Sequence, residues 1–227
     1  MVHPLGQLEL YNILNNSIKM LKGIIFDFDG VIVESVKVKT EAFAEMYRPY
    51  GKKIVKKVVE HHTANGGISR FEKFKLYHKI FLNIDLTASE VEEMANKFSN
   101  LVVEKVISSP YVPGALEYIQ KSFEQYKLFI STGTPTEEMK QILKGRKIAQ
   151  YFTEVFGSPE KKSNHIKIIL SIYGISSNEL VFYGDSDSDL EAAAIESVDF
   201  ILRLHKYNLQ YFHDYTGITI KNFNSHC

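Results

Sequence analysis

The feature that most constrains the fold is an alternation of short apolar runs with longer segments of helical periodicity. Five runs have the composition of buried strands, and each precedes a loop with Gly, Ser or Asp: Ile24–Phe28, Leu128–Ile130, Glu154–Phe156, Leu180–Tyr183 and Phe200–Leu202. Strand, loop and helix repeated in this order favour a parallel sheet with helices on both faces. The sequence therefore predicts an α/β fold.

A long segment between the first two strands, Val36 to Ile119, has a helical pattern and no strand-like run. Two capping-box patterns inside it indicate helix starts: Ser69 with Glu72, and Thr87 with Glu90. Because a crossover between parallel strands needs only about a dozen residues, we expect a separate helical module over residues 35–109. Residues 20–34 and 110–227 would then form the core.

Other patterns mark the ends of elements. Thr134 with Glu137, and Pro135 at the first helical position, predict a helix start after the second strand. The polar sequence ISSPYVPG is predicted to be the linker that returns the chain to the sheet. Residues 1–19 carry apolar side chains at helical spacing and predict an N-terminal helical extension.

Composition limits the kinds of partner. The 27 basic and 27 acidic side chains balance, so no overall field favours nucleic acid or an acidic membrane surface. The one cysteine, Cys227, cannot form an internal disulfide and fits a reducing compartment. No apolar run approaches the ~18 residues of a membrane span, and no signal-peptide pattern is present. We expect a cytoplasmic protein that binds neither nucleic acid nor membrane.

Two aspartates interrupt the end of the first predicted strand. Asp27 and Asp29 each lose hydration there, and at ~4 Å and an effective dielectric constant near 20 they would repel by roughly 4 kcal/mol. The folded protein must therefore supply a cation, a proton or a ligand at this place.

The other predicted strands end in residues that could supply this compensation. The carboxyl ends of parallel strands share one edge, where open sheets bind their ligands. That edge would gather Asp27 and Asp29 with three further segments: Ser131 to Thr134, the sequence GSPEKKSN, and the sequence GDSDSD. Carboxylates, a hydroxyl and a lysine together suit a hard cation bridged to a phosphate.

These motifs, D-F-D-G-V, S-T-G, a lysine and G-D-S-x-S-D, resemble those of the haloacid dehalogenase superfamily, in particular its phosphatase and phosphomutase branch with a helical cap. The resemblance spans Lys22 to Arg203. It implies a Rossmann-like parallel core, an inserted α-helical cap and Mg²⁺ as the cofactor. It also implies that Asp27 is the nucleophile, and that Asp29 acts as acid and then base.

The resemblance assigns binding roles to the other motifs. Ser131 would hold phosphate oxygens together with the backbone at Thr132 and Gly133. Mg²⁺ would be held by four aspartates, with Asp29 contributing its backbone carbonyl: Asp27, Asp29, Asp185 and Asp189. Asp185 and Asp189 are also suited to cap the following helix, and we expect Asp187 to face solvent.

The lysine motif leaves two choices, Lys161 and Lys162, and we favour Lys162 because it precedes Ser163, a candidate helix N-cap. We expect His61 and His62 to lie at a solvated helix end rather than to bind zinc, since no carboxylate stands at ligand spacing.

The helical insert contains the sequence NGGISRFEKF, which resembles the G-x-S-R segment of β-phosphoglucomutase-like caps. The resemblance implies that Arg70 faces the part of the substrate that is not transferred, where a guanidinium suits an anionic or polyol group. Arg70 and Lys73 are expected near an exposed helix start. The alternative for Arg70 is an ordinary exposed residue of the first helical turn.

Together these features predict a Mg²⁺-dependent phosphatase that hydrolyses a small phosphorylated metabolite through an aspartyl-phosphate. A sugar-phosphate mutase would use the same residues, and the motifs do not separate the two. A signalling receiver also clusters aspartates, Ser/Thr and Lys, but it needs neither a large cap nor a second acidic residue poised as acid. A dehalogenase is a weaker alternative, because Asp29 favours phosphoryl chemistry.

Overall fold

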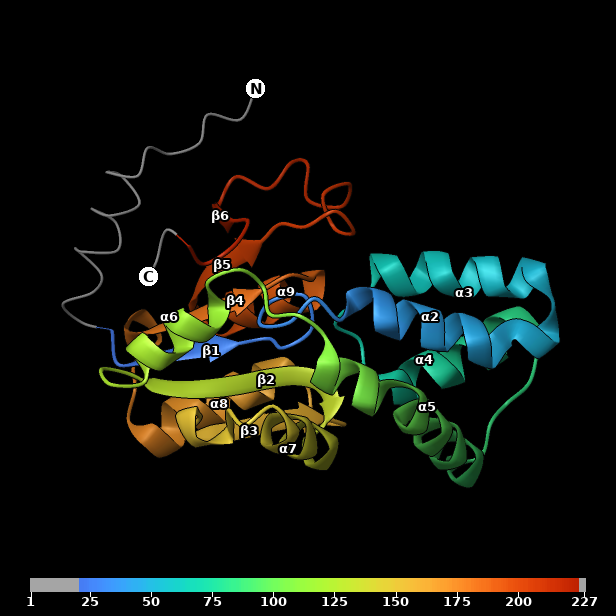
Figure 1. Cartoon of the computed structure of the whole chain (residues 1–227). Coiled ribbons are helices and arrows are strands. Elements are labelled where there is room, and N and C mark those ends of the chain that lie inside the picture. The colour runs from blue at the N-terminus through green and yellow to red at the C-terminus, as the bar shows by residue number, and fades with distance from the viewer. Residues whose placement is uncertain (1–20, 225–227) are drawn as a thin grey trace.

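The protein is described by a computed structural model that covers residues 21–224, so the predicted N-terminal extension and Cys227 lie outside the described residues. Six parallel strands form one sheet in the order β3-β2-β1-β4-β5-β6 (Figure 1). Their bounds are Gly23–Phe26 for β1, Lys127–Pro135 for β2, Glu154–Ser158 for β3, Leu180–Gly184 for β4, Asp199–Arg203 for β5 and Ile218–Ile220 for β6. The predicted α/β fold is confirmed.

All five predicted strands are present, and the differences lie at their ends. β1 ends at Phe26, so Asp27 is the first residue beyond it. β2 continues to Pro135 because its second half pairs with β3 across a register shift, which places Ser131 to Thr134 in the strand rather than in a loop. The short strand β6 was not predicted.

Helices cover both faces of the sheet. On one face, Ile25 packs against α8 (Lys162–Tyr173) and α9 (Asp187–Ile195). On the other face, Ile24 and Phe26 belong to a core that includes α6 (Ala115–Ser122) and α7 (Thr136–Gly145). The alternation along β1 follows from the two-residue period of a strand, and it explains why this strand is apolar throughout.

The segment between β1 and β2 is helical, as predicted, and in Figure 1 it lies beyond the carboxyl ends of the strands. We call residues 36–108 the helical insert; the domain boundaries at residues 35 and 109 stay a prediction. Its elements are α2 (Val36–Tyr47), the short helix η1 (Arg48–Tyr50), α3 (Lys52–Ala64), α4 (Arg70–Tyr77), the π-helical turn η2 (His78–Leu82) and α5 (Ala88–Ser108). Outside the insert, two further 3₁₀ turns are η3 (Ala149–Tyr151) and η4 (Ser177–Glu179).

The helix starts of the insert agree with the sequence. Thr87 and Glu90 form the reciprocal capping box at the start of α5. Ser69 caps α4, where its hydroxyl accepts a hydrogen bond from the backbone N–H of Phe71. Each cap satisfies a donor that a helix start otherwise leaves unpaired.

Two predicted caps outside the insert are wrong. Helix α7 begins at Thr136 with Pro135 in the cap position, because Thr134 still belongs to β2. Helix α8 begins at Lys162, so Ser163 lies inside the first turn rather than at the N-cap. At α7, pairing of β2 with β3 moves the helix start away from the local pattern.

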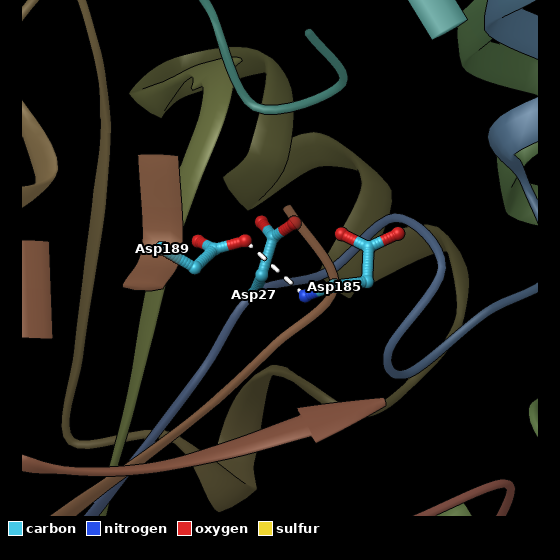
Figure 2. A group of neighbouring side chains, drawn as sticks. All are labelled: Asp27, Asp185 and Asp189. Carbon is cyan, nitrogen blue, oxygen red and sulfur yellow. Dashed lines mark hydrogen bonds between the residues drawn. The ribbon is translucent and has the colours of Figure 1, made fainter. Parts of the chain in front are cut away.

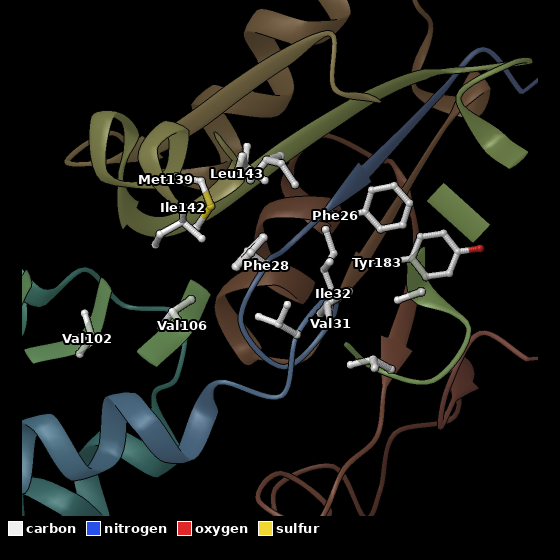
Figure 3. Packing of buried hydrophobic residues seen from close by; sticks show 14 of the residues in the cluster. Phe26, Phe28, Val31, Ile32, Val102, Val106, Met139, Ile142, Leu143 and Tyr183 are labelled. Carbon is white, nitrogen blue, oxygen red and sulfur yellow. The ribbon is translucent and has the colours of Figure 1, made fainter. Parts of the chain in front are cut away.

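One apolar cluster joins the insert to the core. Val102 and Val106 of α5 belong to the same apolar cluster as Met139 and Ile142 of α7, and this cluster also contains Phe26 (Figure 3). Apolar packing therefore places the insert against the sheet edge, because separating the two would expose this surface to water. Within residues 21–224, no helix has the length and apolar character needed to cross a membrane.

Arg146 follows α7 and holds the end of α5. Its Nη1 donates to the carbonyl oxygens of Val106, Ile107 and Ser109 at 2.9, 2.6 and 2.8 Å, and its guanidinium stacks 4.1 Å from the ring centre of Tyr111. A cation at a helix C-terminus satisfies carbonyls that have no partner inside the helix.

We expect Arg146→Met to lower the free energy of unfolding by about 2 kcal/mol, because the methionine keeps the apolar stem but loses the donors. Urea unfolding measures this change, and Lys144→Met, at an exposed position of α7, is the matched control. A loss below about 0.5 kcal/mol would contradict a role for Arg146 in holding α5.

Candidate active site

The candidate site lies where β1 and β4 end. Asp27 directly follows β1, is only 5% exposed, and donates its backbone N–H to the carbonyl oxygen of Tyr183 at 2.9 Å. This bond continues the pairing of β1 with β4 by one residue and fixes the backbone of Asp27. The side chain is therefore positioned by the sheet itself.

Three aspartates gather at this edge, as predicted for the strand ends. Figure 2 shows the carboxylates of Asp27, Asp185 and Asp189 side by side, and one oxygen of each lies within 4.8 Å of the others. The donors are all carboxylate oxygens, which suit Mg²⁺. Oδ1 of Asp27 is buried and accepts no hydrogen bond from residues 21–224, so the cluster offers an acceptor to a cation.

Lys162 brings one positive charge into the cluster. Its Nζ donates to Oδ1 of Asp189 at 2.5 Å and lies 3.3 Å from Oδ1 of Asp27, close enough for an ion pair although not aligned as a hydrogen bond. Burial acts to lower the pKa of Lys162, but Asp189 and Asp27 outweigh it and raise that pKa. Lys161 is exposed, so the structure brings the favoured lysine to the site.

Asp189 also has the predicted helix-capping position. Its Oδ2 accepts hydrogen bonds from the backbone N–H and the hydroxyl of Ser186, at 3.1 and 2.6 Å, and from the N–H of Asp185 at 3.2 Å. Asp187 is exposed, as expected. Both oxygens of Asp189 are thus oriented by protein donors before any ligand binds.

Asp185 has partners that the sequence analysis missed. His205 Nε2 lies 2.7 Å from its Oδ2, and the Asn208 side-chain amide donates to its backbone carbonyl at 2.8 Å. Both partners follow β5, a strand that was predicted, and this position could have identified them as residues of the site. Together they fix the main chain and the carboxylate of Asp185.

The carboxylate of Asp29 has a different set of hydrogen-bond partners from the carboxylate of Asp27. Ser35 donates to its Oδ1 at 2.5 Å, and Lys39 donates to its Oδ2. Lys39 also donates to the hydroxyl of Thr134 at 2.6 Å. Thr134, the predicted cap of α7, therefore contacts Lys39 instead. Lys39 was not singled out from the sequence, because only the fold of α2 brings it to the end of β1.

Burial and charge set the titration of Asp27. Burial is the largest cause of a pKa well above the ordinary aspartate range, and Lys162 opposes it. The neighbouring carboxylates of Asp189, Asp185 and Asp29 add to the rise. The ionised cluster is therefore costly in the protein alone, and a cation would relieve that cost.

The predicted phosphate-binding residues lie on the last part of β2. Ser131 and Thr132 are buried, and the hydroxyl of Ser131 lies 2.9 Å from Nδ1 of His165. A Cβ added to Gly133 would lie 2.9 Å from the carbonyl oxygen of Gly67, so the insert closely approaches β2 at this point. His165 was missed because its contact spans 34 residues of sequence.

The expected exposure of Arg70 and Lys73 is wrong. Both are buried, at 4% and 1% exposed, because Arg70 faces Glu138 of the core and Lys73 packs within the insert against His62 and Phe43. Arg70 forms a double hydrogen bond with Glu138 of α7, at 2.8 and 2.5 Å, and also donates to Ser99. It lines the cavity next to Asp27, yet its guanidinium joins the insert to the core.

The expectation for the histidine pair is wrong for His62, which is 4% exposed and lies 2.9 Å from Nζ of Lys73. His61 is half-buried and contacts the hydroxyl of Tyr77 at 3.1 Å. Among residues 21–224, the only group of three or more potential metal ligands is the aspartate cluster, so the expectation of no zinc site at this pair is not contradicted.

The aspartate cluster lies at the carboxyl edge of a parallel sheet, which is where α/β proteins with such a sheet bind their ligands. Residues 24–202 match the family of haloacid dehalogenase-like hydrolases. Since the match covers well over half of the chain, the protein belongs to this family, and the resemblance noted from the motifs is confirmed.

Two curated relatives of similar sequence are named as phosphatases. The chain is 26% identical over 192 residues to a phosphorylated carbohydrates phosphatase of Thermotoga maritima, covering 79% of this chain and 83% of that protein. It is 26% identical over 182 residues to a phosphoglycolate phosphatase of Vibrio parahaemolyticus, covering 76% and 79%.

Two solved structures share the fold. The β-phosphoglucomutase of Clostridium difficile has a TM-score of 0.72 at 17% identity, covering 90% of this chain and 92% of that one. The protein CbbY of Rhodobacter sphaeroides, in complex with xylulose 1,5-bisphosphate, has a TM-score of 0.70 at 16% identity, covering 90% and 95%.

The contact between His165 and Ser131 gives a pH prediction. Burial, and then Lys162, lowers the pKa of His165 from 6.5 to about 4. Because the folded-state pKa lies below the unfolded one, His165 favours folding above pH ~6.5, and this contribution is lost as the pH falls toward 4. A difference of about 2.5 units corresponds to about 3 kcal/mol, of which about 2 kcal/mol is lost by pH 5.

We therefore expect the free energy of unfolding of the wild type to fall by about 2 kcal/mol more between pH 7 and pH 5 than that of His165→Gln. Denaturant unfolding at the two pH values measures it. His213→Gln, at an exposed histidine, is the control and should keep the wild-type dependence. Identical dependence in His165→Gln and wild type would contradict a buried neutral histidine.

Proposed function

We propose that this chain, a phosphatase of the haloacid dehalogenase superfamily, hydrolyses a small phosphorylated metabolite through an aspartyl-phosphate at Asp27. The observation that carries the proposal is the position of Asp27 directly after β1, with Lys162 and two further carboxylates around it. The Thermotoga relative is named for phosphorylated carbohydrates and the Vibrio relative for phosphoglycolate, which supports a small phosphate ester as substrate.

The reaction would proceed in two displacements. The Asp27 carboxylate attacks phosphorus, a P–O bond to Asp27 forms, and the ester P–O bond breaks while Asp29 gives its proton to the leaving alcohol. Water then attacks phosphorus of the aspartyl-phosphate while Asp29 takes a proton from that water. The P–O bond to Asp27 breaks, the Asp27 carboxylate is restored, and inorganic phosphate leaves. Ser131, with the backbone at Thr132 and Gly133, would hold the phosphate oxygens during both steps.

Mg²⁺ is the cofactor we propose, held by the carboxylates of Asp27, Asp185 and Asp189 and by the backbone carbonyl of Asp29. When bound, the ion would reduce the repulsion between a carboxylate nucleophile and a phosphate dianion. Lys162 keeps Asp27 and Asp189 in place, and His205 and Asn208 orient Asp185. The helical insert would act as a cap that excludes water other than the nucleophile.

Other functions are less well supported. The family match disfavours a signalling receiver, and the curated relatives described above are phosphatases rather than dehalogenases or mutases. The β-phosphoglucomutase structure shares the fold at low identity and does not by itself favour mutase activity. The single cysteine among 227 residues supports a reducing, cytoplasmic compartment.

A screen of phosphorylated metabolites for release of inorganic phosphate tests the proposal and identifies the leaving group. Hydrolysis of at least one small ester is expected without any added sugar bisphosphate. A strict requirement for glucose 1,6-bisphosphate, with isomerised sugar phosphate as the product, would identify a mutase instead.

We expect Asp27→Asn to abolish turnover, because the amide keeps the shape of the side chain but does not attack phosphorus. Far-ultraviolet circular dichroism should show an unchanged fold. Asp187→Asn, at the exposed aspartate of the same edge, should keep wild-type activity. Activity of Asp27→Asn within tenfold of wild type would refute this nucleophile.

Removal of metal gives a second test of the site. EDTA should abolish turnover and Mg²⁺ should restore it, while Ca²⁺ should inhibit, because its looser and higher coordination allows Asp27 to bind through both oxygens. Mg²⁺ should also raise the melting temperature of the wild type but not that of Asp185→Asn. Full activity in EDTA would mean that the carboxylates are compensated in another way.

A further inference from the structure

Three cations of the insert line the cavity beside the aspartate cluster: Lys39, Arg70 and Lys73. Two of them have acidic partners that neutralise them. Lys39 pairs with Asp29, and Arg70 pairs with Glu138 at 2.5 Å. These two cations therefore help to hold the insert on the core and carry little uncompensated charge toward a ligand.

Lys73 differs, because none of its contacts within residues 21–224 is with an acidic group. It is 1% exposed, and its Nζ lies 2.9 Å from Nδ1 of His62 and 3.4 Å from the carbonyl oxygen of Gly66. The ammonium also lies 5.5 Å from the ring centre of Phe43. These neutral groups solvate an ammonium only in part, and a buried charge without a counter-ion is costly.

The pKa values of this pair agree with the geometry. Burial is the largest cause of a pKa of Lys73 well below the ordinary lysine range, and Lys39 and Lys162 add to the effect. Burial, and then Lys73, likewise holds the pKa of His62 well below its ordinary value. The surroundings of Lys73 are therefore electropositive, and the described part of the chain places no anion against it.

His62 completes the arrangement. A neutral imidazole that accepts from the ammonium at Nδ1 carries its proton on Nε2, so His62 brings a second donor to the cavity that it lines. Its ring packs on Phe43 at a centroid distance of 4.6 Å, which fixes its orientation. The pair presents donors and positive charge from the insert to a cavity that Asp27 and Thr132 also line.

We propose that Lys73 and His62 bind an anionic group, a carboxylate or a second phosphate, on the part of the substrate that is not transferred. The substrate class is therefore a phosphate ester with a second negative charge. An anion would supply the counter-ion that Lys73 lacks, whereas a neutral polyol would leave the ammonium uncompensated. The inference rests on the proposed phosphatase function and restricts its substrates to phosphate esters that carry a second anionic group.

Three substrates with the same two-carbon skeleton test the proposal: 2-phosphoglycolate, ethane-1,2-diol bisphosphate and 2-hydroxyethyl phosphate. The first carries a carboxylate, the second a phosphate and the third a neutral hydroxyl in the same place. We expect kcat/KM of at least one charged ester to exceed that of the neutral ester by about tenfold to a hundredfold, and the better one identifies the anion. A wild-type ratio near one for both charged esters overturns the proposal.

Substitution then assigns the effect to Lys73. In Lys73→Met, and in Lys73→Gln should the first variant not fold, the charged-to-neutral ratio is expected to fall to about one. Lys75→Met, which removes an exposed lysine of the same helix, should keep the wild-type ratio. Equal loss on charged and neutral esters would mean that Lys73 supports the fold of the loop at Gly66, and would overturn the proposal.

The same assays separate this inference from the proposed function. Absence of hydrolysis of every ester, including p-nitrophenyl phosphate, contradicts the phosphatase and the anion site together. Hydrolysis of p-nitrophenyl phosphate without a preference for charged esters contradicts the anion site alone. The melting temperature of Lys73→Met should equal or exceed that of the wild type, because the substitution removes an uncompensated buried cation.

Discussion

The ion pair between Lys162 and the aspartates of the sheet edge is the interaction on which the candidate site depends. Three carboxylates, directly after β1, directly after β4 and in the first turn of α9, each have an oxygen within 4.8 Å of the others. One ammonium, at the first position of α8, contacts two of them. If all three are ionised, two negative charges remain, which matches the charge of the divalent cation that we propose.

Position at the sheet edge makes this compensation possible. Asp27 is held by a backbone bond to Tyr183, and Asp189 is held by donors at the start of its own helix. Because the main chain fixes these groups, their repulsion cannot be relieved by moving apart. Oxygen ligands held at close distance are suited to a small hard cation, and in the proposed mechanism the Asp27 carboxylate of this arrangement attacks phosphorus.

The insert contacts the site through polar as well as apolar groups. Arg70 reaches Glu138 across the boundary, and a Cβ on Gly67 would lie 1.9 Å from the hydroxyl oxygen of Ser188, so α4 and the loop before it approach the core closely. Such buried pairs set the geometry of the contact more than its strength. Arg70 is satisfied within the protein, whereas Lys73, three residues further on, has no counter-ion among the described residues. This contrast is the basis for our proposal that Lys73 contacts substrate.

The sequence by itself determined the parallel sheet, the aspartates at its edge and the helical insert, because strand periodicity, helix caps and residue chemistry are local properties. It did not predict that β2 runs through Thr134, since only pairing with β3 makes that segment a strand. Nor did it predict the burial of Arg70, Lys73 and His62, because a polar helix face has the same pattern whether it meets water or other side chains. The tertiary structure decided which cation has a counter-ion, since that depends on side chains far apart in the chain, as Arg70 and Glu138 are.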